Sequence, residues 1–148
     1  MKNITAKLGA LKLMLHDLHL HFTDYSEHLL ADKLQEGIND NIDRLKELEI
    51  SYAGSLEIAS ALESASSVLK EIQAFYPDAT TPAEKHSVEL WKSIRKLYIA
   101  LVGQCKAEIE KTDSEGIMNA LADISEGLMR NKYLVDRVLK GYRIDFKK

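Results

Sequence analysis

The sequence predicts an all-α protein that folds as a four-helix bundle, with a long connection between the second and third helices. Apolar residues recur at steps of three and four along four long segments, which is the spacing of one helix face. The two prolines, Pro77 and Pro82, both lie between the second and third segments. Almost no segment alternates apolar and polar residues as a half-buried strand does.

Length and composition predict one domain, residues 1–148, of ordinary globular character, with 45% hydrophobic and 29% charged residues. The net charge of −3 gives no overall basic field for nucleic acid. Cys105 is the one cysteine, so an internal disulfide is excluded and a reduced, cytoplasmic location is expected. We find neither the apolar core of a signal peptide nor an apolar run of the roughly 20 residues that a membrane span needs.

The first helix is expected from about residue 3 to about residue 22. Its apolar stripe is Ile4, Leu8, Leu11, Leu15, Leu18 and Phe22. The sequence TDYSEH follows, in which Thr23 or Asp24 can cap a new helix and Glu27 is placed to complete a capping box with Asp24.

The second helix is expected to continue to about residue 51. Its apolar stripe is Leu30, Leu34, Ile38, Ile42 (or Asn41), Leu45 and Leu48. The helical signal then weakens over residues 52–79, where LEIASALE and SVLKEIQAF indicate one or two short helices in the long connection.

The third helix is expected over about residues 83–111 and the fourth over about 115–139, with Gly141 as a stop. The stripe of the third is Val88, Trp91, Ile94, Tyr98, Leu101 and Cys105. The stripe of the fourth is Ile117, Leu121, Ile124, Leu128, Leu134 and Val138. Short turns within each helix pair predict two antiparallel hairpins, and the long middle segment can carry the chain along the bundle, which is the connectivity of ferritin-like folds.

A polar stripe also follows the second helix. Its members are His28, Asp32, Glu36, Asp40 (or Asn39), Asp43 and Glu47. A solvated helix face is the ordinary interpretation of such a row. However, the stripe has almost no basic residues, and like charges four residues apart destabilise a helix, so a bound cation would stabilise it.

The chemistry-bearing residues form two pairs, His28 with Asp32 and Asp43 with Glu47. They lie ~22 Å apart along one continuous helix, so one copy cannot bring both to one metal ion. Both pairs are equally far from a midpoint between residues 37 and 38. If two copies of this helix cross antiparallel at the midpoint, the His28–Asp32 pair of each copy meets the Asp43–Glu47 pair of the other copy. The result is an isologous dimer with two equivalent sites. Gly37 lies at this crossing, and a close backbone approach would account for its cost of ~1 kcal/mol inside a helix.

His19, near the end of the first helix, can complete this site beside His28. Two imidazoles with several carboxylates suit iron, and zinc, manganese or cobalt can compete. The ligand set contains no cysteine, which argues against a structural zinc site.

These residues resemble the ferroxidase site of Dps-like mini-ferritins, in the variant with a shortened turn between the first two helices. The matching blocks are HLLAD (28–32) and DRLKE (43–47), ten residues apart, preceded by the histidine at position 19. LADISEGLMRNKYLVDRVL also looks like the last helix of that family. The sequence departs from the family where Leu20 follows His19 in place of the usual tryptophan. The shortened turn leaves His21 as an alternative first ligand, although the spacing favours His19.

The resemblance implies a cytoplasmic ferroxidase that oxidises Fe(II), preferably with hydrogen peroxide, and stores Fe(III) in a hollow shell. The shell would be a homo-oligomer, usually a dodecamer built from two-fold dimers. The implied metal-binding and catalytic residues are His19, His28, Asp32, Asp43 and Glu47. The histidines would act as neutral ligands, Asp32 and Glu47 would bind or bridge iron, and Asp43 would ligate it or hold a water.

Two other functions remain open at this stage. A non-enzymatic helical-bundle dimer could use the same stripe as a structural or metal-bridged interface. DNA binding by the assembly is a third hypothesis, but the acidic balance and the lack of a lysine-rich N-terminal tail do not support it.

Overall fold

The computed structural model describes residues 2–53, 66, 70 and 83–142. The elements within this part of the chain are all helices: α1 (Lys2–His21), α2 (Tyr25–Lys33), α3 (Ile38–Ala53), α5 (Ala83–Lys111) and α6 (Glu115–Gly141). Because α2 and α3 together take the place of the second predicted helix, the predicted all-α class and four-helix arrangement are confirmed.

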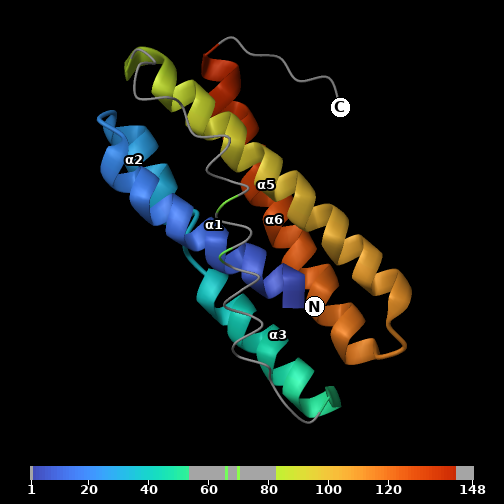
Figure 1. Cartoon of the computed structure of the whole chain (residues 1–148). Coiled ribbons are helices and arrows are strands. Elements are labelled where there is room, and N and C mark those ends of the chain that lie inside the picture. Colours follow the sequence, from blue (N-terminus) through green and yellow to red (C-terminus); the bar gives the residue numbers. More distant parts are fainter. Residues whose placement is uncertain (1, 54–65, 67–69, 71–82, 143–148) are drawn as a thin grey trace.

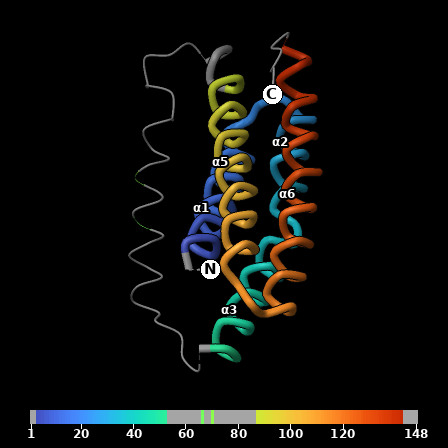
Figure 2. The backbone as a smooth tube through the Cα atoms, turned by 90° about the vertical axis from the view of Figure 1, so that its right-hand side faces the viewer, coloured from blue at the N-terminus to red at the C-terminus, as the bar shows by residue number. Residues whose placement is uncertain are grey.

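The helices form two antiparallel hairpins that pack together (Figure 1). The first hairpin is α1 followed by α2 and α3, and the second is α5 followed by α6. Helix α1 packs against α5, and α3 packs against α6. The end of α3 and the start of α5 lie at opposite ends of the bundle, as Figure 2 also shows, so the connection between them is long, as predicted. Apart from Ser66 and Lys70, the segment predicted to hold short helices lies outside the described residues.

Two of the helices begin at a side chain that caps their first turn. Asp24 caps α2 by accepting a hydrogen bond from the backbone N–H of Glu27 at 3.1 Å. Ser114 caps α6 in the same way through the N–H of Ile117 at 3.2 Å. Each cap satisfies a backbone donor that the first helical turn leaves without a partner. Helix α6 ends at Gly141, the expected stop.

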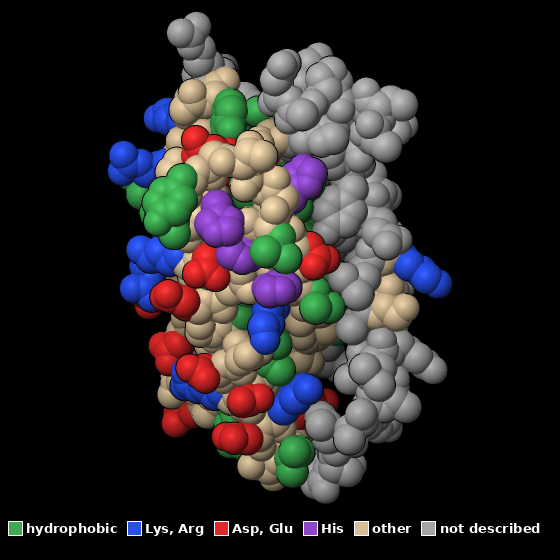
Figure 3. Space-filling model, turned by 90° about the vertical axis from the view of Figure 1, so that its left-hand side faces the viewer, with side chains coloured by type: hydrophobic (Ala, Val, Ile, Leu, Met, Phe, Trp, Pro, Cys, Tyr) green, Lys and Arg blue, Asp and Glu red, His purple; other side chains and the backbone are tan. Residues whose placement is uncertain are grey.

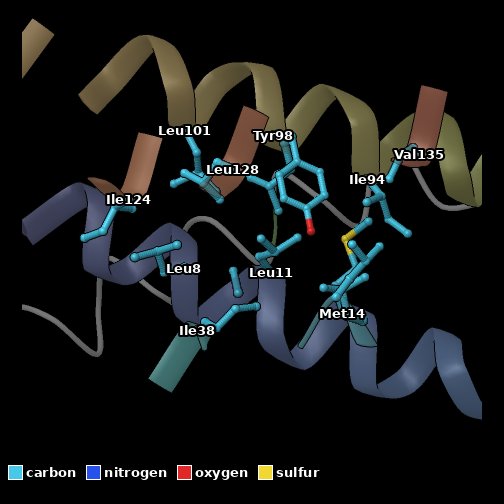
Figure 4. Packing of buried hydrophobic residues seen from close by; sticks show 14 of the residues in the cluster. Leu8, Leu11, Met14, Ile38, Ile94, Tyr98, Leu101, Ile124, Leu128 and Val135 are labelled. Atoms are coloured by element: carbon cyan, nitrogen blue, oxygen red, sulfur yellow. The ribbon is translucent and has the colours of Figure 1, made fainter. Parts of the chain in front are cut away.

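The predicted apolar stripes meet in one core (Figure 4). Every residue in the apolar stripe of the first predicted helix is at most 5% exposed. Trp91 and Tyr98 of α5 are fully buried, and Figure 4 shows Tyr98 pointing toward Leu11 and Met14 of α1. Burying each large side chain of this kind stabilises the fold by ~1.5–3 kcal/mol.

The last part of the α6 stripe differs from the prediction by one position. Val135 and Leu139 are fully buried, whereas the predicted Leu134 and Val138 are only partly buried. All four are apolar and adjacent in pairs, so the periodicity of the sequence cannot separate the central position from its neighbour.

The prediction of one continuous second helix is wrong at residues 34–37, where a turn separates α2 from α3. At this turn, three backbone N–H groups each donate a hydrogen bond to the carbonyl oxygen three residues earlier. The N···O distances are 3.1 Å from Gln35, 3.1 Å from Glu36 and 3.3 Å from Ile38. Gly37 has a φ of 80°, in the left-handed region. An L-residue in that conformation costs ~1–2 kcal/mol, so the turn itself accounts for the glycine. Gly37 therefore lies outside a helix, and the expected cost of a glycine inside a helix does not arise at this position.

Across the described residues, no helix combines the length and the apolar character needed to cross a bilayer.

Candidate metal centre

The hairpin of α1 and α2 brings His19 and His28 together. Their ring centroids are 4.2 Å apart, and the rings are inclined by 32°. His19 lies in the last turns of α1 and His28 in the first turn of α2, so the short intervening turn and the Asp24 cap fix their approach. Both side chains are partly buried, which leaves one edge of the pair open to the surface.

The ring of His28 is oriented by the backbone of His19. Its Nδ1 atom makes a short hydrogen bond with the carbonyl oxygen of His19. A carbonyl only accepts, so Nδ1 must carry the proton. In the neutral imidazole, Nε2 then holds the free lone pair and is the atom that can bind a metal ion. A backbone carbonyl that fixes the tautomer in this way is the usual support of a metal-binding histidine.

His19 carries a buried nitrogen without a partner. Its Nδ1 has no hydrogen-bond partner among the described atoms. A buried polar atom left unpaired costs ~1–3 kcal/mol, so a ligand or a water molecule at this nitrogen would stabilise the protein. His16 continues the row on α1 with its ring centroid 5.9 Å from that of His19. Figure 3 shows histidine side chains gathered on one face, with acidic side chains near them.

The structure favours His19 over His21 as the first histidine of the pair. The ring that lies against His28 is that of His19. His21 is exposed at the end of α1. The ring beside His28 is thus that of His19, the residue that the spacing favours.

The predicted carboxylates lie on the exposed surface of the first hairpin. Asp32 is one turn beyond His28 on α2, and Asp43 and Glu47 are on α3, beyond the turn at 34–37. Within the described ranges, no three or more histidine, cysteine, aspartate or glutamate side chains are grouped closely enough to hold a metal ion. One chain thus brings His19 and His28 together but does not assemble the five predicted ligands into one site.

Apolar side chains are exposed on the same hairpin. Leu13 and Leu20 of α1 are 52% and 68% exposed, at helical spacing on either side of His16. Tyr25 and Leu29 of α2 are 74% and 46% exposed. A contiguous group of exposed apolar side chains would be typical of a face that another molecule covers.

The sequence did not predict the role of the Glu27 side chain. Half of the expected capping box forms, because the Glu27 N–H bonds to Asp24. Glu27 as a whole is only 7% exposed. Its carboxylate turns inward and accepts hydrogen bonds from Trp91 Nε1 at 3.0 Å and from the hydroxyl of Tyr142. Burial and this carboxylate together raise the pKa of Tyr142 to about 12. The donors lie 64 and 115 residues away, so no local motif could have indicated them.

No family model, no curated protein and no solved structure matches this chain.

Proposed function

We propose that this protein is an iron-binding ferroxidase and iron-storage protein of the Dps-like mini-ferritin type. The observation that carries the proposal is the pair His19 and His28, with rings 4.2 Å apart and the Nε2 atom of His28 left free as a ligand. The pair supplies nitrogen ligands on an exposed hairpin whose other predicted ligands are carboxylates. Imidazole and carboxylate together suit iron, and zinc, manganese or cobalt can compete for them.

The rest of the site would come from a second copy of the chain. Within the described part of one chain, no complete group of metal ligands forms. In a shared site each chain supplies only part of the ligands. The turn at Gly37 lies midway between the His28–Asp32 pair and the Asp43–Glu47 pair. A two-fold axis near this turn would direct α2 of one copy toward α3 of its partner, and the exposed Leu20 and Leu29 would be covered.

In this proposal Fe(II) and hydrogen peroxide are the substrates. Two Fe(II) ions supply the two electrons that reduce one peroxide to water, so no hydroxyl radical is released. Fe(III) then hydrolyses and is stored in a hollow homo-oligomer, for which we propose the twelve subunits typical of the family. Because the histidines bind as neutral imidazoles, iron binding should weaken at low pH.

The rate of Fe(II) oxidation by peroxide tests this proposal. We expect the wild-type protein to run as a large assembly and to accelerate oxidation over the protein-free reaction. The double change His28→Ala and Asp32→Ala should remove most of the acceleration, and so should His19→Ala. His21→Ala is the matched control and should retain it. An unchanged rate in the double variant would exclude this site.

A second candidate is a non-enzymatic bundle dimer whose interface is structural or metal-bridged. Exposed apolar side chains on α1 and α2 favour this candidate, namely Leu13, Leu20, Tyr25 and Leu29. A dimer interface would remove them from water whether or not the protein oxidises iron. This candidate predicts the mass of a dimer without a shell, and Fe(II) oxidation no faster than in buffer.

A further inference from the structure

Glu27 is a buried carboxylate directly before the ligand residue His28. It has no ion pair with a basic side chain among the described residues, and its hydrogen-bond donors are the neutral groups of Trp91 and Tyr142. Burying a polar group costs free energy unless hydrogen bonds compensate it. The hydrogen bonds from these two donors compensate the burial of the carboxylate.

The two donors come from the second hairpin. Trp91 is fully buried on α5. The ring of Phe22 stacks on it, with the two ring centroids 4.9 Å apart and an interplanar angle of 8°. Tyr142 caps the end of α6. Glu27 thus connects the first turn of α2 to α5 and to the end of α6.

Helix α2 has little else to hold it on that side. Its main helix partner is α1. Between α2 and α6 lies a hollow of ≈ 420 Å³, lined by Ser26, Leu30, Val138 and Tyr142 among others. Because apolar side chains do not fill this junction, the hydrogen bond from Tyr142 to Glu27 is a principal tie across it.

The orientation of His28 depends on the same helical turn. Its Nδ1 reaches the carbonyl oxygen of His19 only while the start of α2 stays against the end of α1. We infer that Glu27, held by Trp91 and Tyr142, is a positioning residue that keeps His28 against His19 with its Nε2 atom presented to a metal ion. Its metal-binding consequence rests on the proposed function, whereas its effect on the His28 ring does not.

The test measures two properties of the full-length protein. The first is the tautomer of His28, read from ring ¹⁵N chemical shifts at a pH where the ring is neutral. The second is the affinity of the apoprotein for Co(II), read from its absorption spectrum. Glu27→Leu removes the acceptor, Tyr142→Phe removes one donor and keeps the ring, and Glu27→Gln keeps an acceptor oxygen. Tyr133→Phe is the matched control, because Tyr133 lies on α6, the helix that Tyr142 caps, and is 59% exposed.

We expect wild-type His28 to be in the Nδ1–H form and Glu27→Leu to give a mixture of tautomers. Co(II) affinity should fall by about 10-fold in Glu27→Leu and by a smaller factor in Tyr142→Phe, as for other residues that orient metal ligands. Glu27→Gln and Tyr133→Phe should resemble the wild type. If Glu27→Leu does not fold, Tyr142→Phe decides the outcome by the same two readouts.

The two proposals can fail separately. A folded Glu27→Leu or Tyr142→Phe variant with the wild-type tautomer and wild-type Co(II) affinity would overturn the positioning role. If the wild type binds no metal but the variants change the His28 tautomer, the positioning role stands and the proposed function fails.

Discussion

Asp136 links the two helices of the second hairpin by charge. It accepts hydrogen bonds from Arg95 of α5 at 2.6 Å and from Lys132 of its own helix at 3.0 Å. Burial alone would raise the pKa of Asp136, but the hydrogen bonds and positive charges of Lys132 and Arg95 outweigh it and lower the pKa. The ionised carboxylate therefore stabilises the folded state.

We predict that Asp136→Asn lowers the free energy of unfolding by about 1 kcal/mol, because it weakens a charge-assisted contact that is largely shielded from water. Asp123→Asn is the matched control. Its pair with Arg44 joins side chains that are 65% and 46% exposed, so its loss should cost at most about 0.5 kcal/mol. Urea unfolding at neutral pH measures the free energy of unfolding of both variants. Equal losses in the two variants would contradict the larger contribution assigned to Asp136.

The lowered pKa of Asp136 predicts that the stability of the fold depends on pH. A carboxyl whose pKa is lower in the folded state than in the unfolded chain stabilises the fold above the unfolded pKa of about 4, and this contribution is lost as the pH falls through the folded pKa. The difference in unfolding free energy between wild type and Asp136→Asn should therefore be full at pH 6 and shrink below pH 4. A difference that grows toward acid would show that Asp136 is not held ionised.

At this scale a local pattern predicts only what neighbours in the sequence determine. The motif Asp24 to Glu27 correctly predicted a helix start, and the structure shows Asp24 as its cap. It could not predict where the Glu27 carboxylate goes, because Trp91 and Tyr142 approach it only once the second hairpin has packed.

Among the helices, the turn between α2 and α3 is the main departure from the prediction. Leu34, the first residue of this turn, and Ile38, the residue directly after it, are both buried, so the apolar stripe continues without interruption. Periodicity therefore carried no sign of the break. The one available signal was Gly37, which the turn requires at its φ of 80°.

We predict that Gly37→Ala lowers the free energy of unfolding by about 1 kcal/mol, because alanine is strained in the left-handed region. Gly127→Ala is the matched control, since a Cβ atom added to Gly127 inside α6 meets nothing within 4 Å. It should raise stability by about 0.5–1 kcal/mol. Chemical denaturation of both variants checks the prediction, and a gain in stability from Gly37→Ala would show that the second helix is continuous.

For the whole molecule, the four long periodic segments were sufficient to predict the bundle, its two hairpins and the long connection. The candidate site was predictable only as residue types at fixed spacing. Whether Asp43 and Glu47 meet His28 depends on a second copy of the chain, and the fold of one chain does not contain that contact. The proposal of a shared site is therefore a statement about assembly as much as about ligands.

Mixing two inactive variants tests the shared site most directly. One chain would carry His28→Ala and Asp32→Ala, and the other Asp43→Ala and Glu47→Ala. Each variant alone has no intact site, whether ligands come from one chain or two. In a mixed two-fold dimer, the intact halves of the two chains meet in one of its two sites, so equal co-assembly should recover about one quarter of the wild-type sites.

The measurement is the rate of Fe(II) oxidation by peroxide after the two variants are unfolded together and co-refolded, compared with each variant refolded alone. We predict that the mixture recovers about one quarter of the wild-type rate, while each variant alone stays at background. A co-assembled mixture that also stays at background would contradict a site shared across a two-fold interface.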